Sequence, residues 1–133
     1  EYGGVVKSKE KLKKGLGEIK SLKNASKDLD VRPDSEGYQD LMLAFDLEAS
    51  IISSEATLLS ALNREESRGA HTREDFPSEK KEWLEYNIIN KKGKGGEMET
   101  IKEKRSNPDP ELQRIANSSI EDLDKEVKLD HQK

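Results

Sequence analysis

The chain has 133 residues, of which 31% are hydrophobic and 39% charged, so it can bury only a modest core and has no room for separate cofactor and substrate domains. Its 24 basic and 28 acidic residues are interleaved and sum to a net charge of −4, which argues against the clustered basic surface of a nucleic-acid-binding protein. The absence of cysteine excludes disulfides, thiolate metal sites and cysteine nucleophiles.

A first helix is predicted after Ser8, whose hydroxyl can cap its N-terminus. Apolar residues recur along it at helical spacing: Leu12, Leu16, Ile19 and Leu22. Gly15 and Gly17 each cost about 1 kcal/mol of intrinsic helix stability relative to alanine, so we expect this helix to depend on a packing partner. Pro33 pushes the residue before it out of the helical region, which ends the helix within residues 30–34.

A second helix, from about residue 35 to residue 66, is the strongest structural signal in the sequence. One apolar stripe comprises Leu41, Phe45, Ala49, Ile52, Ala56 and Leu59. An adjacent stripe comprises Leu43, Leu47, Ile51, Leu58 and Leu62. Because two stripes make a helix apolar over much of its circumference, this helix should lie between neighbours. The first helix covers one side, and a later helix, a second copy or another domain must cover the other.

A third, short helix is predicted from the cap Ser78, with Trp83, Leu84 and Ile88 as its apolar residues. The glycine-rich stretch 91–96 is typical of a flexible linker or a turn, and it lacks the Lys-Ser/Thr ending of a phosphate-binding loop. We predict no strand in this chain.

Two further helix starts are predicted in the C-terminal part. The pair Asp109–Pro110 is typical of an N-cap followed by a proline in the first turn. A capping box is formed either by Ser118 with Glu121 or by Ser119 with Asp122. Because these helices carry few apolar residues, they are either docked weakly or mobile.

We therefore predict an all-α fold, in which residues 1–90 form an antiparallel three-helix bundle and residues 91–133 form a polar linker and a helical tail. The longest apolar run, residues 41–45, is far shorter than the ~20 residues of a membrane-spanning helix, so we expect no direct membrane insertion. The first residue is Glu1 rather than methionine, which we expect of a piece of a longer protein. An apolar stripe left uncovered in such a piece predicts a weak homodimer.

The segment Glu66–Pro77 holds most of the rare residue types of the chain. Gly69 can take the left-handed conformation that closes a helix, and Arg64 and Arg68 suit the negative end of the helix dipole. Pro77 then redirects the chain. The simplest interpretation of this segment is a well-formed helix exit.

Catalytic and metal-binding interpretations of this segment are weaker. Ser67, His71 and Asp75 have the four-residue spacing of one helix face, but the segment is not expected to be a continuous helix, and geometry rather than residue type defines a triad. His71 with Glu74 or Asp75 lacks the ligand spacing of a metal site, since the other histidine is His131. We therefore expect no catalytic, cofactor-binding or metal-binding residue in this chain.

Several stretches resemble the C-terminal helical domain of the flavoprotein subunit of succinate dehydrogenases and fumarate reductases. They are Glu66–His71, Arg73–Pro77 and Trp83–Leu84, together with the opening Gly4–Val6 and Leu12–Leu16. The resemblance covers Gly4–Ile88 and departs from the family pattern at Tyr86, where a histidine is usual. L-aspartate oxidases share the fold and a similar Glu-Ser-Arg-Gly stretch, so they are the sibling alternative.

The resemblance implies a non-catalytic domain that packs on a larger FAD-binding domain and on an iron–sulfur subunit. The parent enzymes interconvert succinate and fumarate with FAD, and their cofactor and substrate residues lie upstream of this domain. The implied location is cytoplasmic, or peripheral to the inner face of a membrane through the parent complex. The candidate interface residues are Glu66, Ser67, Arg68, His71, Arg73 and Asp75. The competing hypothesis is a free-standing helical interaction module that associates through the second stripe.

Overall fold

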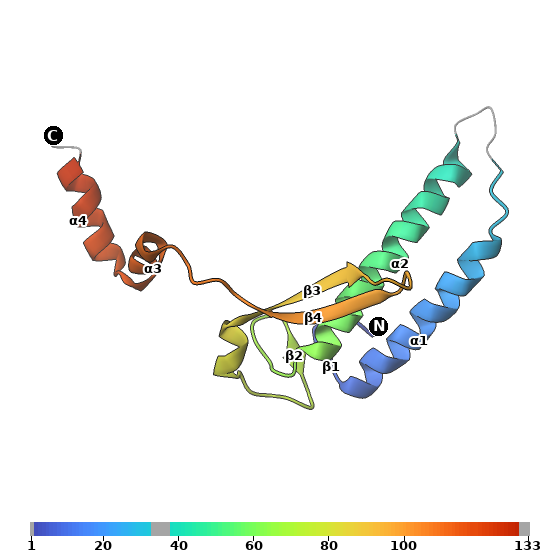
Figure 1. Cartoon of the computed structure of the whole chain (residues 1–133), viewed down its shortest axis with the longest axis horizontal. Helices are drawn as coiled ribbons and strands as arrows, with labels where there is room; N and C mark the ends of the chain where they lie inside the picture. Colours follow the sequence, from blue (N-terminus) through green and yellow to red (C-terminus); the bar gives the residue numbers. More distant parts are fainter. Residues whose placement is uncertain (1, 33–37, 131–133) are drawn as a thin grey trace.

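The computed structural model describes residues 2–32 and 38–130 (Figure 1). Its helices are α1 Lys9–Ala25, α2 Gln39–Asn63, α3 Pro110–Asn117 and α4 Ile120–Asp130, with the 3₁₀ turns η1 Ser26–Asp28 and η2 Lys81–Leu84. Its strands are β1 Val6–Lys7, β2 Thr72–Arg73, β3 Tyr86–Lys92 and β4 Met98–Lys104. The predicted all-α three-helix bundle is therefore wrong, because two sheets contribute 17% strand beside 53% helix.

Helices α1 and α2 run antiparallel and hold the core between them (Figure 1). Ser8 caps α1 as predicted, and its Oγ accepts a hydrogen bond from the backbone N of Lys11 at 3.3 Å. The buried side chains at the centre are Leu12, Leu58 and Ala61, and the partly buried ones around them are Tyr2, Leu16, Ile19 and Leu62. The core of the helix pair is as small as the composition predicts.

A β-hairpin stands where the third helix was predicted, so the expectation of no strand is wrong as well. Trp83 and Leu84 lie in η2, whereas Ile88 belongs to β3, which pairs antiparallel with β4. The cause is a burial period of two, since every second residue at the start of β3 is half-buried: Tyr86, Ile88 and Asn90. The stretch 91–96 contains the hairpin turn, with Gly96 at a φ of +85°.

This hairpin packs against the C-terminal half of α2 (Figure 1). Asn90 fixes the contact, because its Nδ2 donates to Ala56 O at 3.1 Å and to Ser60 Oγ at 2.7 Å. Thr100 of β4 donates in turn to Asn90 Oδ1 at 2.7 Å. The second neighbour that α2 was predicted to need is thus a two-stranded sheet.

A second, short sheet ties the start of the chain to the loop after α2. Strand β1 runs parallel to β2, with Val6 opposite Thr72. The backbone N of Thr72 donates to Val5 O at 3.2 Å, and that of Glu74 donates to Lys7 O at 2.8 Å. The segment 66–77 is therefore held at the base of the helix pair.

The N-terminal half of α2 is poorly covered. Of the two predicted stripes, Ile51 and Leu58 are buried, whereas the large side chains that precede them are exposed: Leu41, Leu43, Phe45 and Leu47. The helix ends at Asn63 rather than at residue 66. Its predicted start at residue 35 lies outside the described residues.

The tail begins its helices at the predicted caps. Asp109 Oδ1 accepts from the backbone N of Glu111 at 2.8 Å, with a proline in the first turn of α3. Ser119 Oγ accepts from the backbone N of Asp122 at 3.2 Å, so the second of the two capping boxes is formed. Helices α3 and α4 lie apart from the helix pair (Figure 1). Within the described ranges, no helix is long and apolar enough to cross a membrane.

Candidate functional site

Residues 64–80, here called the exit loop, connect the end of α2 to η2. Gly69 has a positive φ of 56°, but it lies in a two-residue turn and not at the helix end that was predicted. The backbone N of Arg68 donates to His71 O at 2.8 Å, and the N of His71 donates to Arg68 O at 3.0 Å. This reciprocal pair closes the turn, and glycine supplies the left-handed residue that the turn needs.

Glu66 lies at the centre of the exit loop and has no exposed surface. Its Oε1 accepts from Arg64 Nη2 at 2.6 Å, and its Oε2 accepts from Arg68 Nη2 at 3.1 Å and from the backbone N of Lys80 at 2.9 Å. Burial opposes ionisation, but the hydrogen bonds outweigh it and lower the pKa of Glu66 from 4.5 to about 2. The hydrogen bond with Glu66 in turn raises the pKa of Arg68. One carboxylate therefore joins the two ends of the loop.

Arg73 is the second charged residue of the loop without exposed surface. Its Nη1 donates to backbone oxygens at the end of α2, those of Ala61 at 2.6 Å, Leu62 at 3.1 Å and Arg64 at 3.2 Å. Its Nε and Nη2 each bind an oxygen of Asp75 at 2.8 Å, and this pair lowers the pKa of Asp75. Asp75 Oδ2 also accepts from the backbone N of Lys9, at 3.1 Å. One ion pair thus satisfies the C-terminus of α2 and the N-terminus of α1.

Ser67 and His71 bond to the backbone. Ser67 Oγ accepts from the N of Arg73 at 2.8 Å and donates to Phe76 O at 2.9 Å. His71 Nε2 lies 3.1 Å from Arg64 O and donates to it, since a carbonyl oxygen only accepts. Burial lowers the pKa of His71, and nearby cationic side chains lower it further, so its ring is neutral near pH 7. In the described structure, neither side chain makes the nucleophile–base hydrogen bond of a catalytic triad.

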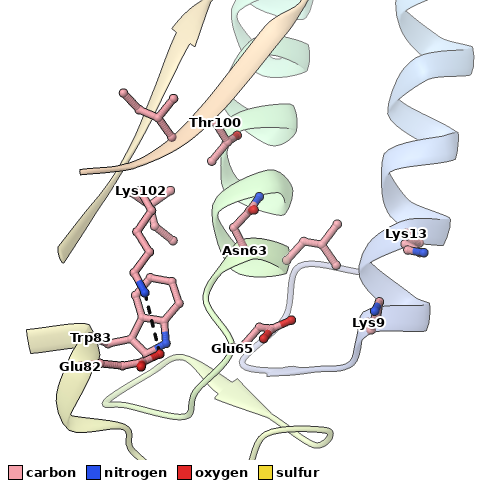
Figure 2. A pocket seen from close by; sticks show the side chains of 11 residues that line it. Lys9, Lys13, Asn63, Glu65, Glu82, Trp83, Thr100 and Lys102 are labelled. Atoms are coloured by element: carbon pink, nitrogen blue, oxygen red, sulfur yellow. Dashed lines mark ion pairs between the residues drawn. The ribbon is translucent and has the colours of Figure 1, made fainter. Parts of the chain in front are cut away.

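A pocket of about 440 Å³ opens beside the exit loop, between the hairpin and the start of α1 (Figure 2). Lys9 lies on one side of it, and Trp83 and Lys102 lie on the other (Figure 2). Lys102 Nζ is 4.0 Å from the ring centre of Trp83, 4.3 Å from that of Tyr86 and 3.8 Å from Glu82 Oε1. Tyr86, the residue that departs from the family pattern, therefore helps to hold a lysine of the hairpin.

The residues present do not form a site for FAD or for a metal ion. The glycine-rich turn leads from β3 into β4, whereas a pyrophosphate-binding turn leads from a strand into the N-terminus of a helix. Among the described residues, no group of three or more histidine or acidic side chains could hold a metal. What the charged groups of the exit loop do is neutralise one another and tie three segments together.

All six candidate interface residues meet in the exit loop, but they differ in accessibility. Glu66 and Arg73 have no exposed surface, Ser67, Arg68 and His71 are half-buried, and Asp75 is exposed. Sequence reasoning missed Arg64 and the backbone of Lys80 as partners of Glu66. It also missed the contact of Lys102 with Trp83 and Tyr86, for which the alternation in 86–92 and 98–104 was the available signal.

Comparison with known sequences shows the family. The model of the family described as fumarate reductase flavoprotein C-term matches residues 1–127. One of the polypeptides of the fumarate reductase (CoM/CoB) of Methanothermobacter marburgensis is 39% identical over 89 residues, which cover 66% of this chain and 16% of that protein. The succinate dehydrogenase flavoprotein subunit of Rickettsia felis is 33% identical over 89 residues, which cover 65% of this chain and 15% of that protein. The matched part is thus about a sixth of the length of these relatives.

Solved structures share the fold. The Mycobacterium smegmatis Sdh1 complex in the apo form matches with a TM-score of 0.72 and 25% identity, covering 79% of this chain and 18% of that chain. Sdh1 of the same organism in complex with UQ1 matches with a TM-score of 0.74 and 22% identity, covering 91% of this chain and 20% of that chain. The chain belongs to the C-terminal domain family of the fumarate reductase and succinate dehydrogenase flavoprotein subunits.

Proposed function

We propose that this chain is the C-terminal domain of an FAD-dependent succinate dehydrogenase or fumarate reductase, and that the domain catalyses no reaction by itself. The family match over residues 1–127 carries the proposal. The exit loop supports it, because its buried acid and base groups are used for internal ion pairs rather than aimed at a substrate. FAD and the substrate would then be bound by the remaining part of the parent polypeptide.

We propose further that the exit loop contacts the parent assembly through Arg68 and His71, while Glu66, Ser67, Arg73 and Asp75 hold the loop in shape. Arg68 and His71 keep part of their surface exposed. Since His71 uses Nε2–H as a donor, its neutral ring has Nδ1 left as an acceptor, and no described residue donates to that atom. A donor from the FAD-binding domain or from the iron–sulfur subunit would satisfy it.

The assembly around the domain is also part of the proposal. Solved relatives include the quinol fumarate reductase of E. coli and the Sdh1 complex of M. smegmatis. By analogy, the parent of this chain would bind an iron–sulfur subunit and lie peripherally at the inner face of a membrane.

The test is an assay of the parent polypeptide beside the chain 1–133 alone. We expect the parent to show flavin absorbance and to reduce an artificial electron acceptor with succinate. The chain alone should do neither. Activity with L-aspartate in place of succinate would favour the sibling enzyme, and flavin or activity in the isolated chain would overturn the non-catalytic role.

A further inference from the structure

The N-terminal half of α2 extends well beyond the end of α1. Lys23, close to the C-terminus of α1, pairs with Glu55 of α2 at 2.9 Å, so residues 39–54 precede the last direct ion pair between the two helices. That stretch is about 24 Å long at 1.5 Å per residue. Its large apolar side chains are open to solvent, and Phe45 is 63% exposed.

One side of this stretch forms the floor of a groove of about 780 Å³, here called the α2 groove. Its floor consists of Phe45, Ile51 and Ile52, and its walls are Leu29 and Val31 after α1 and Met98 of the hairpin. Lysines and glutamates stand around these apolar side chains. An apolar hollow of this size with a charged rim is typical of a contact site between proteins or domains.

The length of the relatives indicates what fills the groove. This chain matches about a sixth of each flavoprotein subunit, so five-sixths of those polypeptides lie elsewhere in the same molecule. A domain tethered to the same chain has an effective concentration on the order of millimolar, and it therefore outcompetes a second copy present at lower concentration. The groove is also too apolar to be left in water in a stable enzyme.

We propose that the α2 groove is the surface on which the FAD-binding part of the same polypeptide docks, with an apolar helix or loop seated against Phe45 and Ile52. This inference rests on the proposed function and assigns the contact to one face of the domain. The exit loop, at the other end of α2, is then a separate contact region.

Photo-cross-linking in the full parent polypeptide tests this assignment. The variant Phe45→p-benzoylphenylalanine places the probe on the groove floor, and Ile52→p-benzoylphenylalanine repeats the measurement should the first variant fail to fold. Ser21→p-benzoylphenylalanine is the matched control, because Ser21 is exposed on α1, two residues before the Lys23–Glu55 pair. Cross-linked peptides are identified by mass spectrometry after irradiation of the flavin-loaded protein.

We expect the groove probes to cross-link to peptides that precede residue 1, with a yield several times that of the control. Cross-links only to a second copy, only to the iron–sulfur subunit, only within residues 1–133, or no more than the control yield would overturn the assignment. The unmodified parent separates the two proposals. If it binds no flavin and oxidises no succinate, the proposed function fails; if it does both and the groove probes cross-link elsewhere, only the docking surface fails.

Discussion

At Glu66, a carboxylate without solvent contact stays ionised because two guanidinium groups and one backbone N–H face it. The arrangement joins residues that are adjacent in the loop to Lys80, 14 residues further along. Its free-energy contribution depends on pairing, since a buried charge that loses its partner is costly.

We predict that Glu66→Gln lowers the free energy of unfolding of the chain by about 2–3 kcal/mol. This is less than the 3–5 kcal/mol of a fully buried pair, because Arg64 and Arg68 keep part of their side chains in water. Urea unfolding followed by circular dichroism measures the change. The control is Glu79→Gln, which removes an exposed partner of Arg68 and should cost about 0–1 kcal/mol. Equal effects of the two variants would contradict the central place of Glu66.

The lowered pKa of Glu66 also predicts a pH dependence. Its pKa is about 2 in the folded chain against 4.5 ordinarily, so the unfolded state takes up the proton first as the pH falls. The stabilisation from this group, about 3 kcal/mol, is present above pH 4.5 and is lost as the pH falls towards 2. Unfolding of the wild type and of Glu66→Gln should therefore converge over this range. A stability difference that stays constant down to pH 2 would refute the linkage.

The motif around Glu66 was visible in the sequence, but the burial of its charges was not. Glu66 and Arg73 are flanked by charged residues, which is the pattern of a solvated surface. Their burial depends on partners that the fold brings from elsewhere: Ala61 from α2 for Arg73, and the backbone of Lys80 for Glu66. Spacing along the chain carries no information about such contacts. The interface role of the motif stays a prediction.

At the scale of elements, Gly15 of α1 shows why a residue that weakens an isolated helix is useful here. A Cβ on Gly15 would lie 2.6 Å from the Cβ of Tyr2 and 3.1 Å from Leu58 Cδ1. The missing side chain lets the N-terminal segment and α2 both approach α1. Gly17, two residues on, has no such neighbour, and a Cβ there would meet nothing within 4 Å.

Alanine at these two positions should act with opposite signs. We predict that Gly15→Ala destabilises the chain by about 1–3 kcal/mol, because neither Tyr2 nor Leu58 can withdraw without disturbing the core. Gly17→Ala should stabilise it by about 0.5–1 kcal/mol through helix propensity. Thermal unfolding of both variants beside the wild type decides the matter. Stabilisation by both substitutions would show that Tyr2 does not pack against α1 in solution.

Helix caps were predictable and the hairpin was not, for a physical reason. Ser8, Asp109 and Ser119 act on backbone groups two or three residues away, so their effect is contained in the local sequence. The strands β3 and β4 alternate lysine and glutamate with a few apolar residues, which resembles the solvated side of a helix. Their pairing with each other and with α2 becomes visible only in three dimensions.

At the scale of the whole molecule, the tail is joined to the rest at one point. Arg105 ends the hairpin, where its N donates to Glu85 O at 2.8 Å. The hydrogen bonds described beyond it, from residue 109 to residue 125, join residues of the tail to one another. The division of the sequence at residue 90 stays a prediction, and we propose for the tail that the body folds without it.

A chain ending at Ser106 should therefore unfold at the same midpoint temperature as the full chain. Differential scanning calorimetry gives this midpoint, and far-ultraviolet circular dichroism should show only the loss of the helical signal of α3 and α4. Ending the chain at Lys92 instead removes β4 and should destabilise the body, which provides the contrast. A lower midpoint for the chain ending at Ser106 would mean that the tail docks in solution.

That the chain is one domain of a flavoenzyme rather than an independent module is tested most directly by the DNA sequence upstream of the Glu1 codon. We predict that the reading frame continues upstream and encodes a strand–turn–helix unit with a Gly-x-Gly-x-x-Gly motif, the signature of a dinucleotide-binding domain. A start codon directly before the Glu1 codon, with no such frame, would contradict this and leave a small module whose apolar groove must be covered by another protein.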